Sequence, residues 1–299
     1  MFLSAELRIT AENRDMDAVK NSKGVSILII AVIYVMAVLL GAYIYLMLPF
    51  AFWLNLLIAD AAATVFVYVF SVIFNNASVY DPYWSVQPVI IIAGFALGSK
   101  ITAASLLLIV SIVYWGVRLT ANWAYTFGGL KHQDWRYTKY QNETGRLYQI
   151  VNFAGIHMMP TLIVYLCTLP AVFVTREESD ANIGSVIGTV ICLGAATLQL
   201  FADVQMQKFR KSGTKGLIRT GLWKYARHPN YLGEISMWWG IAIQAVSVMP
   251  ERWWLIAGAV ANTVLFLTVS IPLADKRQSK KPGYADYKAC TRCLLPIPK

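Results

Sequence analysis

Residues 25–47 read VSILIIAVIYVMAVLLGAYIYLM, a run without a charged side chain. A helix needs ~20 apolar residues to cross a bilayer core. The stretch 85–99 is shorter and contains Pro88, so it forms either a bent span or a re-entrant hairpin. We count it as a span. The spans are 25–47, 51–74, 85–99, 101–121, 150–173, 183–207, 231–249 and 253–273. The sequence therefore predicts an all-α polytopic membrane helix bundle of eight transmembrane helices.

The composition excludes an ordinary soluble domain, since 57% of the residues are hydrophobic, 14% are charged and the mean hydropathy is +0.52. The formal net charge of +10 raises the question of nucleic acid. However, the cations lie in a few loops between apolar spans and form no recognisable nucleic-acid-binding module. We expect no nucleic-acid partner and explain the cations by membrane topology.

The charged loops set the orientation. Basic residues precede the first span and fill the loops 122–149 and 208–230 and the C-terminal tail, whereas the acidic loop 177–180 falls on the other side. The positive-inside rule then places both termini in the cytoplasm. Because no small-residue cleavage site follows the first apolar run, we expect a retained helix. The expected divisions are a cytoplasmic segment 1–24, an accessory helix 25–48 and one catalytic domain 49–299.

Neither disulfides nor a metal site are expected from the four cysteines. Cys167 and Cys192 lie in apolar spans, and Cys290 and Cys293 form a single Cys-x-x-Cys in a tail predicted to face the reducing cytoplasm. A structural zinc site needs about four ligands, and nothing nearby in the sequence supplies the other two.

A polar stripe marks the cytoplasmic end of the span 183–207. Its members are spaced by four, four and three residues, which places them on one helix face: Gln199, Asp203, Gln207 and Arg210. Such a face is costly in lipid, so we expect it to point into the bundle. The side chains are either interhelical ties or part of a binding site.

The run 221–234, GLWKYARHPNYLGE, follows that stripe. Pro229 suits the first turn of a helix, whose free N–H groups attract anions. A ligand rich in phosphate needs cations, hydrogen-bonding groups and flat side chains on which to stack. The sequence offers Arg210, Arg219, Trp223, Tyr225, Arg227, His228, Asn230 and Tyr231.

Glu234 lies one helical turn deeper than Asn230. A carboxyl group at that depth must be paired, hydrogen-bonded or protonated. It either bridges to Arg118 or holds a cofactor or a substrate. A third polar patch, 75–88, contains the turn opener Asp81-Pro82 and aromatic residues typical of an interfacial belt. Gln87, already inside an apolar stretch, is its strongest candidate for a functional residue.

These residues resemble the steroid 5α-reductase-like membrane proteins, in particular the bacterial branch called DUF1295. The resemblance covers roughly 55–299 and depends on Asp203 to Arg210, the run 221–234 and the tail KKPGYADYKACTRCLLPIP. It implies an NADPH-dependent reductase of carbon–carbon double bonds in the bacterial inner membrane, with its cofactor site facing the cytoplasm. The cofactor contacts that it implies are Asp203, Arg210, Tyr225, Arg227, His228, Asn230, Tyr231, Glu234 and Tyr287. The polar residues described above add Gln199, Arg219 and Trp223 to the candidate cofactor contacts.

The substrate half of the family pattern is less complete. In the eukaryotic steroid enzymes, two residues bind the carbonyl oxygen of an enone. One is a glutamate beside a proline, and the other is a tyrosine that precedes a His-Arg pair. Here these positions correspond to Gln87 before Pro88 and to Tyr114 or Trp115 ahead of Arg118. We therefore expect a lipophilic, steroid- or isoprenoid-like substrate that enters from the bilayer. The catalytic candidates are Tyr114, Gln87, Asp81 and Glu234, with Tyr83 as a further hydrogen-bond donor.

One rival resemblance stays open. Isoprenylcysteine carboxyl methyltransferases and phospholipid methyltransferases also carry an Arg-His-Pro-x-Tyr-x-Gly run followed by a glutamate, and they bind S-adenosylmethionine. Asn230 in the variable position, Glu234 one turn later and Asp203 upstream favour the reductases. A transporter is disfavoured, because the polar residues gather at one membrane face instead of lining a path through the middle.

Overall fold

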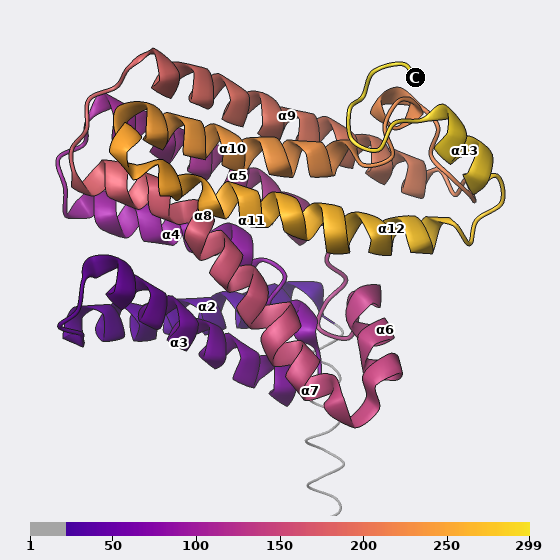
Figure 1. Cartoon of the computed structure of the whole chain (residues 1–299). Coiled ribbons are helices and arrows are strands. Elements are labelled where there is room, and N and C mark those ends of the chain that lie inside the picture. Colours follow the sequence, from indigo (N-terminus) through magenta and orange to yellow (C-terminus); the bar gives the residue numbers. More distant parts are fainter. Residues whose placement is uncertain (1–21) are drawn as a thin grey trace, which may run out of the picture. The chain divides into compact units, whose positions relative to one another are not determined.

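The computed structural model describes residues 22–299 (Figure 1), and every regular element in that range is a helix. The expected segment 1–24, with Arg8, Arg14 and Lys20, therefore lies almost entirely outside the described residues. The α-helices are α2 Lys23–Met47, α3 Phe52–Ile73, α4 Tyr83–Leu97, α5 Ala103–Thr126, α6 Trp135–Thr144, α7 Tyr148–Ile150, α8 Met159–Arg176, α9 Ile183–Lys211, α10 Pro229–Val248, α11 Ala257–Leu265, α12 Ile271–Gln278 and α13 Tyr284–Cys290. Short 3-10 turns lie at Ala77–Val79, Gly145–Leu147, Gly221–Lys224 and Pro250–Ile256, and π-helical turns at Val151–Met158 and Phe266–Ser270.

Six described helical segments are long and apolar enough to cross a membrane: Lys23–Met47, Phe52–Ile73, Ala103–Thr126, Trp135–Arg176, Ile183–Lys211 and Pro250–Gln278. The all-α polytopic bundle is thus confirmed. Helix α4 forms as one helix of 15 residues with Pro88 inside it, about 22 Å long and so shorter than the ~30 Å core. Helix α10 has 20 residues, but Glu234 and Gln244 lower its hydropathy. The count of eight and the cytoplasmic termini stay predictions.

Contacts divide the bundle into two compact units. Unit 1 holds the described residues up to Gln87 together with Leu119–Leu162, and unit 2 holds Pro88–Arg118 and Ile163–Lys299. The boundaries fall inside α4, α5 and α8. No polar linker marks them, which is why the sequence does not predict this division. The expected functional division into 25–48 and 49–299 stays a prediction.

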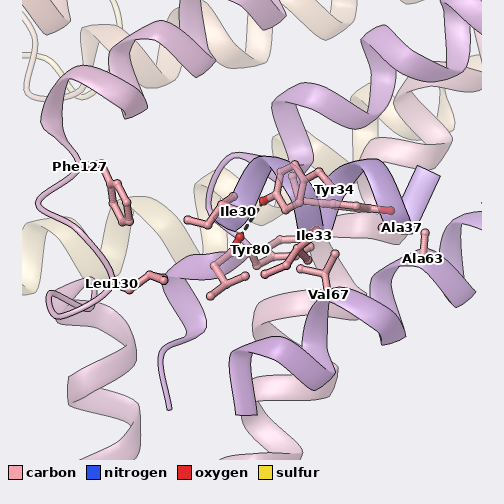
Figure 2. Packing of buried hydrophobic residues seen from close by; sticks show 11 residues of the cluster. Ile30, Ile33, Tyr34, Ala37, Ala63, Val67, Tyr80, Phe127 and Leu130 are labelled. Carbon is pink, nitrogen blue, oxygen red and sulfur yellow. Dashed lines mark hydrogen bonds between the residues drawn. The ribbon is translucent and has the colours of Figure 1, made fainter. Parts of the chain in front are cut away.

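The core of unit 1 forms where α2 packs along α3 (Figure 2). Gly41 of α2 allows close approach, since a Cβ at this position would lie 3.4 Å from the Ala59 carbonyl oxygen. The Tyr34 hydroxyl donates a 2.7 Å hydrogen bond to the Val79 carbonyl and ties α2 to the turn after α3. The predicted accessory helix therefore belongs to the packed core of unit 1.

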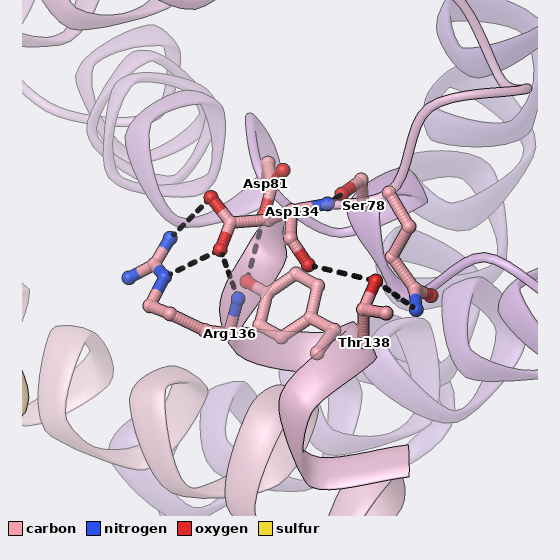
Figure 3. A network of polar contacts seen from close by, with 7 residues as sticks. Ser78, Asp81, Asp134, Arg136 and Thr138 are labelled. Atoms are coloured by element: carbon pink, nitrogen blue, oxygen red, sulfur yellow. Dashed lines mark hydrogen bonds and ion pairs between the residues drawn. The ribbon is translucent and has the colours of Figure 1, made fainter. Parts of the chain in front are cut away.

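A polar network joins that turn to α6 (Figure 3). Asp134 caps α6 by accepting a 2.8 Å hydrogen bond from the Arg136 N–H, and its own N–H donates to the Ser78 hydroxyl at 2.9 Å. The Tyr137 hydroxyl donates to Asp81 Oδ1 at 2.7 Å. These bonds fix the position at which α4 begins.

Unit 2 is organised by the antiparallel pair α9 and α10, which lie side by side (Figure 1). A Cβ on Gly188 would lie 2.6 Å from the Gly240 carbonyl oxygen, and one on Gly240 would lie 2.8 Å from the Gly188 carbonyl oxygen. Nearer the start of α10, a Cβ on Gly233 would lie 2.6 Å from the Ala195 carbonyl oxygen. The two backbones therefore touch, as small residues permit between membrane helices.

Candidate functional site

Glu234 is the best-anchored polar residue of unit 2. The residue is 4% exposed. Oε2 accepts hydrogen bonds from Trp115 Nε1 at 2.9 Å and from Gln199 Nε2 at 2.7 Å, and Oε1 accepts one from Trp238 Nε1 at 2.9 Å. Three neutral donors from α5, α9 and α10 thus converge on one carboxyl group. Trp238 was not anticipated, because an indole in an apolar run has the sequence signature of a core residue.

Arg118 does not reach Glu234 and pairs instead with Asp203 at 2.8 Å, with 5% and 19% of the two side chains exposed. The interhelical tie left open by the sequence is therefore between α5 and α9. Gln199 and Asp203 both face inward, as the polar stripe predicts. Arg210, at the end of the stripe, is exposed, and Gln207 is half-buried with a partner.

Tyr114 precedes Trp115 on α5 and is half-buried. Its hydroxyl lies 3.0 Å from the Thr197 hydroxyl of α9, and either atom can be the donor. Of the four catalytic candidates, Tyr114 and Glu234 lie in unit 2, whereas Gln87 and Asp81 lie in unit 1.

The run 221–234 is hydrogen-bonded through its backbone to the C-terminal tail. Arg292 accepts a 3.0 Å hydrogen bond from the Arg227 N–H through its carbonyl and donates its own N–H to the Tyr225 carbonyl at 2.9 Å. The Cys293 carbonyl accepts from the His228 N–H at 3.1 Å. The loop 225–228 thus takes backbone partners from the end of the chain.

Two predicted cofactor residues are buried supports of this loop. Trp223 Nε1 donates to the Ala202 carbonyl at 3.0 Å, and the Tyr287 hydroxyl donates to the Trp223 carbonyl at 2.6 Å. Gly221 opens the turn with φ of +58°, and a Cβ there would clash with the Gln205 amide. The Tyr287 hydroxyl therefore already donates its proton within the protein.

Arg227 and His228 share a carboxylate that was not among the predicted site residues. His228 Nε2 lies 2.8 Å from Asp275 Oδ1, and Arg227 Nε lies 3.5 Å from the same atom. Burial lowers the pKa of His228, although the Asp275 carboxylate opposes this. The His228 ring stacks on Tyr231 at 5.1 Å. The signal for Asp275 was a carboxylate at the end of the last apolar span.

The side chains of three predicted cofactor residues are exposed or half-buried. The Asn230 amide, half-buried in the first turn of α10, has no hydrogen-bond partner among the described residues. Arg219 is exposed, donates to the Gly283 carbonyl at 2.7 Å and lies 5.7 Å from the Tyr287 ring centre. Tyr225 is half-buried beside Lys224.

Positive charge accumulates around these groups. The segment 208–230 contains no acidic residue. Burial and the neighbouring cations Arg277 and Arg210 lower the pKa of Lys281. A surface whose cations destabilise one another's charge favours an anionic ligand.

Two unit 1 candidates, Tyr83 and Gln87, are hydrogen-bonded to the same residue, which sequence reasoning missed. Tyr83 donates to Asp60 Oδ1 at 3.0 Å, and Gln87 Nε2 donates to Asp60 Oδ2. A single carboxyl group inside an apolar span was the signal that should have identified Asp60. Burial raises the pKa of Asp81 to about 6, with Arg136 and the Tyr137 hydrogen bond acting against it.

Among residues 22–299, no group of three or more histidine, cysteine, aspartate or glutamate side chains is placed to hold a metal ion. Over the same range all four cysteines are free. The polar groups of the candidate site are thus cations, amides, aromatic rings and isolated carboxylates.

Comparison with known proteins identifies a family. The family described as "Protein of unknown function (DUF1295)" matches residues 67–291. An uncharacterized protein of the fission yeast Schizosaccharomyces pombe is 23% identical over 193 residues, which cover 55% of this chain and 56% of the yeast protein. The chain thus spans about half the length of this curated relative. No solved structure matches the chain significantly.

Proposed function

Because the chain belongs to the DUF1295 family, we propose that it is a membrane-embedded, NADPH-dependent reductase. It transfers a hydride to an activated carbon–carbon double bond of a lipophilic, steroid- or isoprenoid-like substrate. The substrate enters from the bilayer of a bacterial inner membrane, and the cofactor enters from the cytoplasm. The support for this proposal is the resemblance of the run 221–234 together with the side chains that remain open around it.

The observation that carries the proposal is Asn230. Its side-chain amide is unpartnered among the described residues and lies in the first turn of α10, where the helix dipole and free N–H groups favour negative charge. NADPH carries phosphates, ribose hydroxyls and a carboxamide, so cations, an amide and an aromatic face suit it. The exposed cations of the segment 208–230 are Lys208, Arg210, Lys211, Lys215, Arg219 and Lys224.

We assign distinct tasks to these residues. Arg210 and Arg219 bind phosphate groups, Tyr225 offers a flat face, and Asn230 orients the end of the cofactor that bears the carboxamide. Arg227, His228 and Tyr287 act on this ligand indirectly, because their side chains hold the loop in place. Bound NADPH supplies the hydride.

Within unit 2, Glu234 is a positioning residue. Its three hydrogen bonds clamp α5, α9 and α10 together, which fixes the helix that carries Tyr114. We assign to the Tyr114 hydroxyl the hydrogen bond that stabilises negative charge on the substrate oxygen, since Thr197 is its one hydrogen-bond partner in the described range.

Thermal unfolding of the detergent-purified protein with NADPH, NADH or S-adenosylmethionine tests this function. We expect NADPH to raise the unfolding midpoint, and Asn230→Ala and Arg210→Ala to weaken NADPH binding at least about tenfold, or about 1.4 kcal/mol. Cys290→Ala, an exposed change outside the site, is the control. Stabilisation by S-adenosylmethionine alone identifies a methyltransferase of the isoprenylcysteine carboxyl or phospholipid type. Stabilisation by none of the three refutes the proposed cofactor site.

A further inference from the structure

The turn that joins α12 to α13 (Figure 1) brings the C-terminal tail against the loop 212–220, which follows α9. Its sequence, Lys281-Pro282-Gly283-Tyr284, places proline and glycine at the two positions where a type II turn favours them. Gly283 has φ of +74° and ψ of +11°, and the Tyr284 N–H donates to the Lys281 carbonyl at 3.3 Å. The turn therefore holds Lys281 at a fixed position beside the loop.

Two reciprocal side-chain hydrogen bonds join this turn to the loop. Lys281 Nζ donates to the Gly216 carbonyl at 2.9 Å, and Arg219 Nη2 donates to the Gly283 carbonyl at 2.7 Å. Glycine suits position 283 because φ is positive and because a Cβ there would lie 2.7 Å from Arg219 Nη2. The Tyr287 ring centre lies 5.7 Å from the same guanidinium. The tail and the loop thus each contribute a cation to the contact between them.

The segments that meet here carry positive charge and no negative charge. Segments 208–224 and 276–285 contain no aspartate or glutamate, and their cations are Lys208, Arg210, Lys211, Lys215, Arg219, Lys224, Lys276, Arg277, Lys280 and Lys281. Burial lowers the pKa of Lys281, and the cations Arg277 of α12 and Arg210 of α9 lower it further. Cations from two helices and the turn therefore oppose one another's charge, and an anion bound among them removes that cost.

We infer that the tail and the loop together bind the phosphate group of a phosphate monoester, through the cations Arg210, Arg219, Arg277 and Lys281. The inference rests on the proposed function for the source of this group, which is the 2′-phosphate of NADPH. NADH carries a hydroxyl group in its place. Lys281 and Arg277, which lie outside the run 221–234, are therefore the residues that make the site selective for NADPH over NADH.

Charge and hydrogen-bonding capacity favour a phosphate monoester over other anions. A monoester carries a charge of about −1.5 to −2 at pH 7 and three strong acceptor oxygens, whereas a phosphodiester or a carboxylate carries a single charge. Of the three N–H groups on Lys281 Nζ, the Gly216 carbonyl takes one. The Arg210 side chain has neither a hydrogen bond nor an ion pair among the described residues, so its planar fork of donors is available. The donors and charges thus suit a dianion.

Equilibrium binding of NADPH and NADH to the whole chain in detergent, measured by calorimetry, is the first test. The two nucleotides differ only in the 2′-phosphate, so the ratio of their affinities isolates its contribution. The wild type should bind NADPH at least about tenfold more tightly than NADH. Lys281→Met should lower the NADPH affinity by about tenfold and change the NADH affinity by less than about twofold. Lys281→Arg, which keeps the charge, should keep the preference.

The matched control is Lys288→Met, which removes an exposed cation from α13 of the same tail. It changes the net charge by the same amount as Lys281→Met, so it reports the effect of the general positive field. Lys288→Met should leave the affinity ratio unchanged. An equal fall of the ratio in the two variants, or an unchanged ratio in Lys281→Met, overturns the inference. Arg277→Met gives the same readout if Lys281→Met does not fold.

A second test separates the nucleotide from a lipid source of the same chemical group. Phosphatidic acid is a phosphate monoester, and phosphatidylglycerol is a diester. The protein is placed in phosphatidylcholine nanodiscs that contain one or the other, and the lipid that it retains on extraction is measured by mass spectrometry. If NADPH is the source, the two anionic lipids should be retained equally by the wild type and by Lys281→Met.

The outcomes distinguish the inference from the proposed function. A preference for phosphatidic acid that Lys281→Met removes, without binding of NADPH, supports the monoester site and refutes the proposed reductase. Equal binding of NADPH and NADH, without a preference for phosphatidic acid, leaves a nucleotide site and overturns the inference. The absence of a monoester preference in both tests also overturns it.

Discussion

Replacement of Glu234 by glutamine tests the anchoring of unit 2 most directly. The carboxylate accepts two hydrogen bonds at Oε2 and one at Oε1. A glutamine with its oxygen in the Oε2 position keeps the bonds from Trp115 and Gln199, but its NH₂ group then faces the Trp238 N–H. The buried Trp238 N–H then has no acceptor, so we expect a loss of about 1–3 kcal/mol in the free energy of unfolding.

Glu234→Ala should be much worse. It leaves three buried donors without an acceptor, and each costs about 1–3 kcal/mol. The sum, about 3–9 kcal/mol, is comparable to the whole stability of many proteins. The predicted order of stability is therefore wild type, then Glu234→Gln, then Glu234→Ala.

Thermal unfolding in detergent, followed by intrinsic tryptophan fluorescence, gives this order, because Trp115 and Trp238 themselves hold the carboxylate. The matched control is Glu143→Gln, where the glutamate side chain is 58% exposed and pairs with Lys139 at 3.7 Å. This surface pair should contribute less than about 1 kcal/mol. If Glu234→Gln equals the wild type, or if Glu234→Ala is no less stable than Glu234→Gln, the anchoring role of Glu234 is refuted.

Three other perturbations test the remaining architecture by unfolding midpoints. Gly240→Ala should lower the free energy of unfolding by about 1–3 kcal/mol, because the new Cβ would lie 2.8 Å from the Gly188 carbonyl oxygen. The control Gly194→Ala on α9, where a Cβ would meet no atom within 4 Å, should be neutral or stabilising. Equal effects of the two changes would contradict close contact between the helices. Arg118→Met should lower the free energy of unfolding by about 3 kcal/mol, because it leaves Asp203 without its ion-pair partner. Adding Asp203→Leu should restore part of this stability. If the effects of the two changes simply add, the ion pair does not contribute to stability. Burial lowers the pKa of His228 in the folded protein, so its contribution to stability is present above the unfolded pKa of about 6.5 and lost as the pH falls through the folded pKa. The midpoint difference between wild type and His228→Gln should shrink below pH ~6.5, and a difference that grows on acidification would mean that the pairing with Asp275 dominates.

Local signals in the sequence were sufficient for much of the framework. Pro229 begins α10 as its fixed backbone geometry indicates, and the spacing from Gln199 to Asp203 correctly predicts an inward-facing stripe. Such signals depend on residues that are near one another in the chain. The helical class follows for the same reason, since apolar length alone defines a membrane span.

The partners of these residues could not be predicted in the same way. Arg118 is 85 residues from Asp203, and nothing in the sequence ranks that partner above Glu234. The donors to Glu234 include indoles, which hydropathy counts as apolar. Asp60 was visible as a lone charge in an apolar span, but its bond to Gln87 depends on how α4 packs against α3.

The backbone hydrogen bonds between the loop 225–228 and residues 292–293 have a consequence for biosynthesis. The loop leaves the ribosome well before the residues that complete its backbone bonding, so its final form must wait until those residues have been made. Nascent chains that stall or are cut short near position 290 would insert their helices normally, yet leave this loop unfinished.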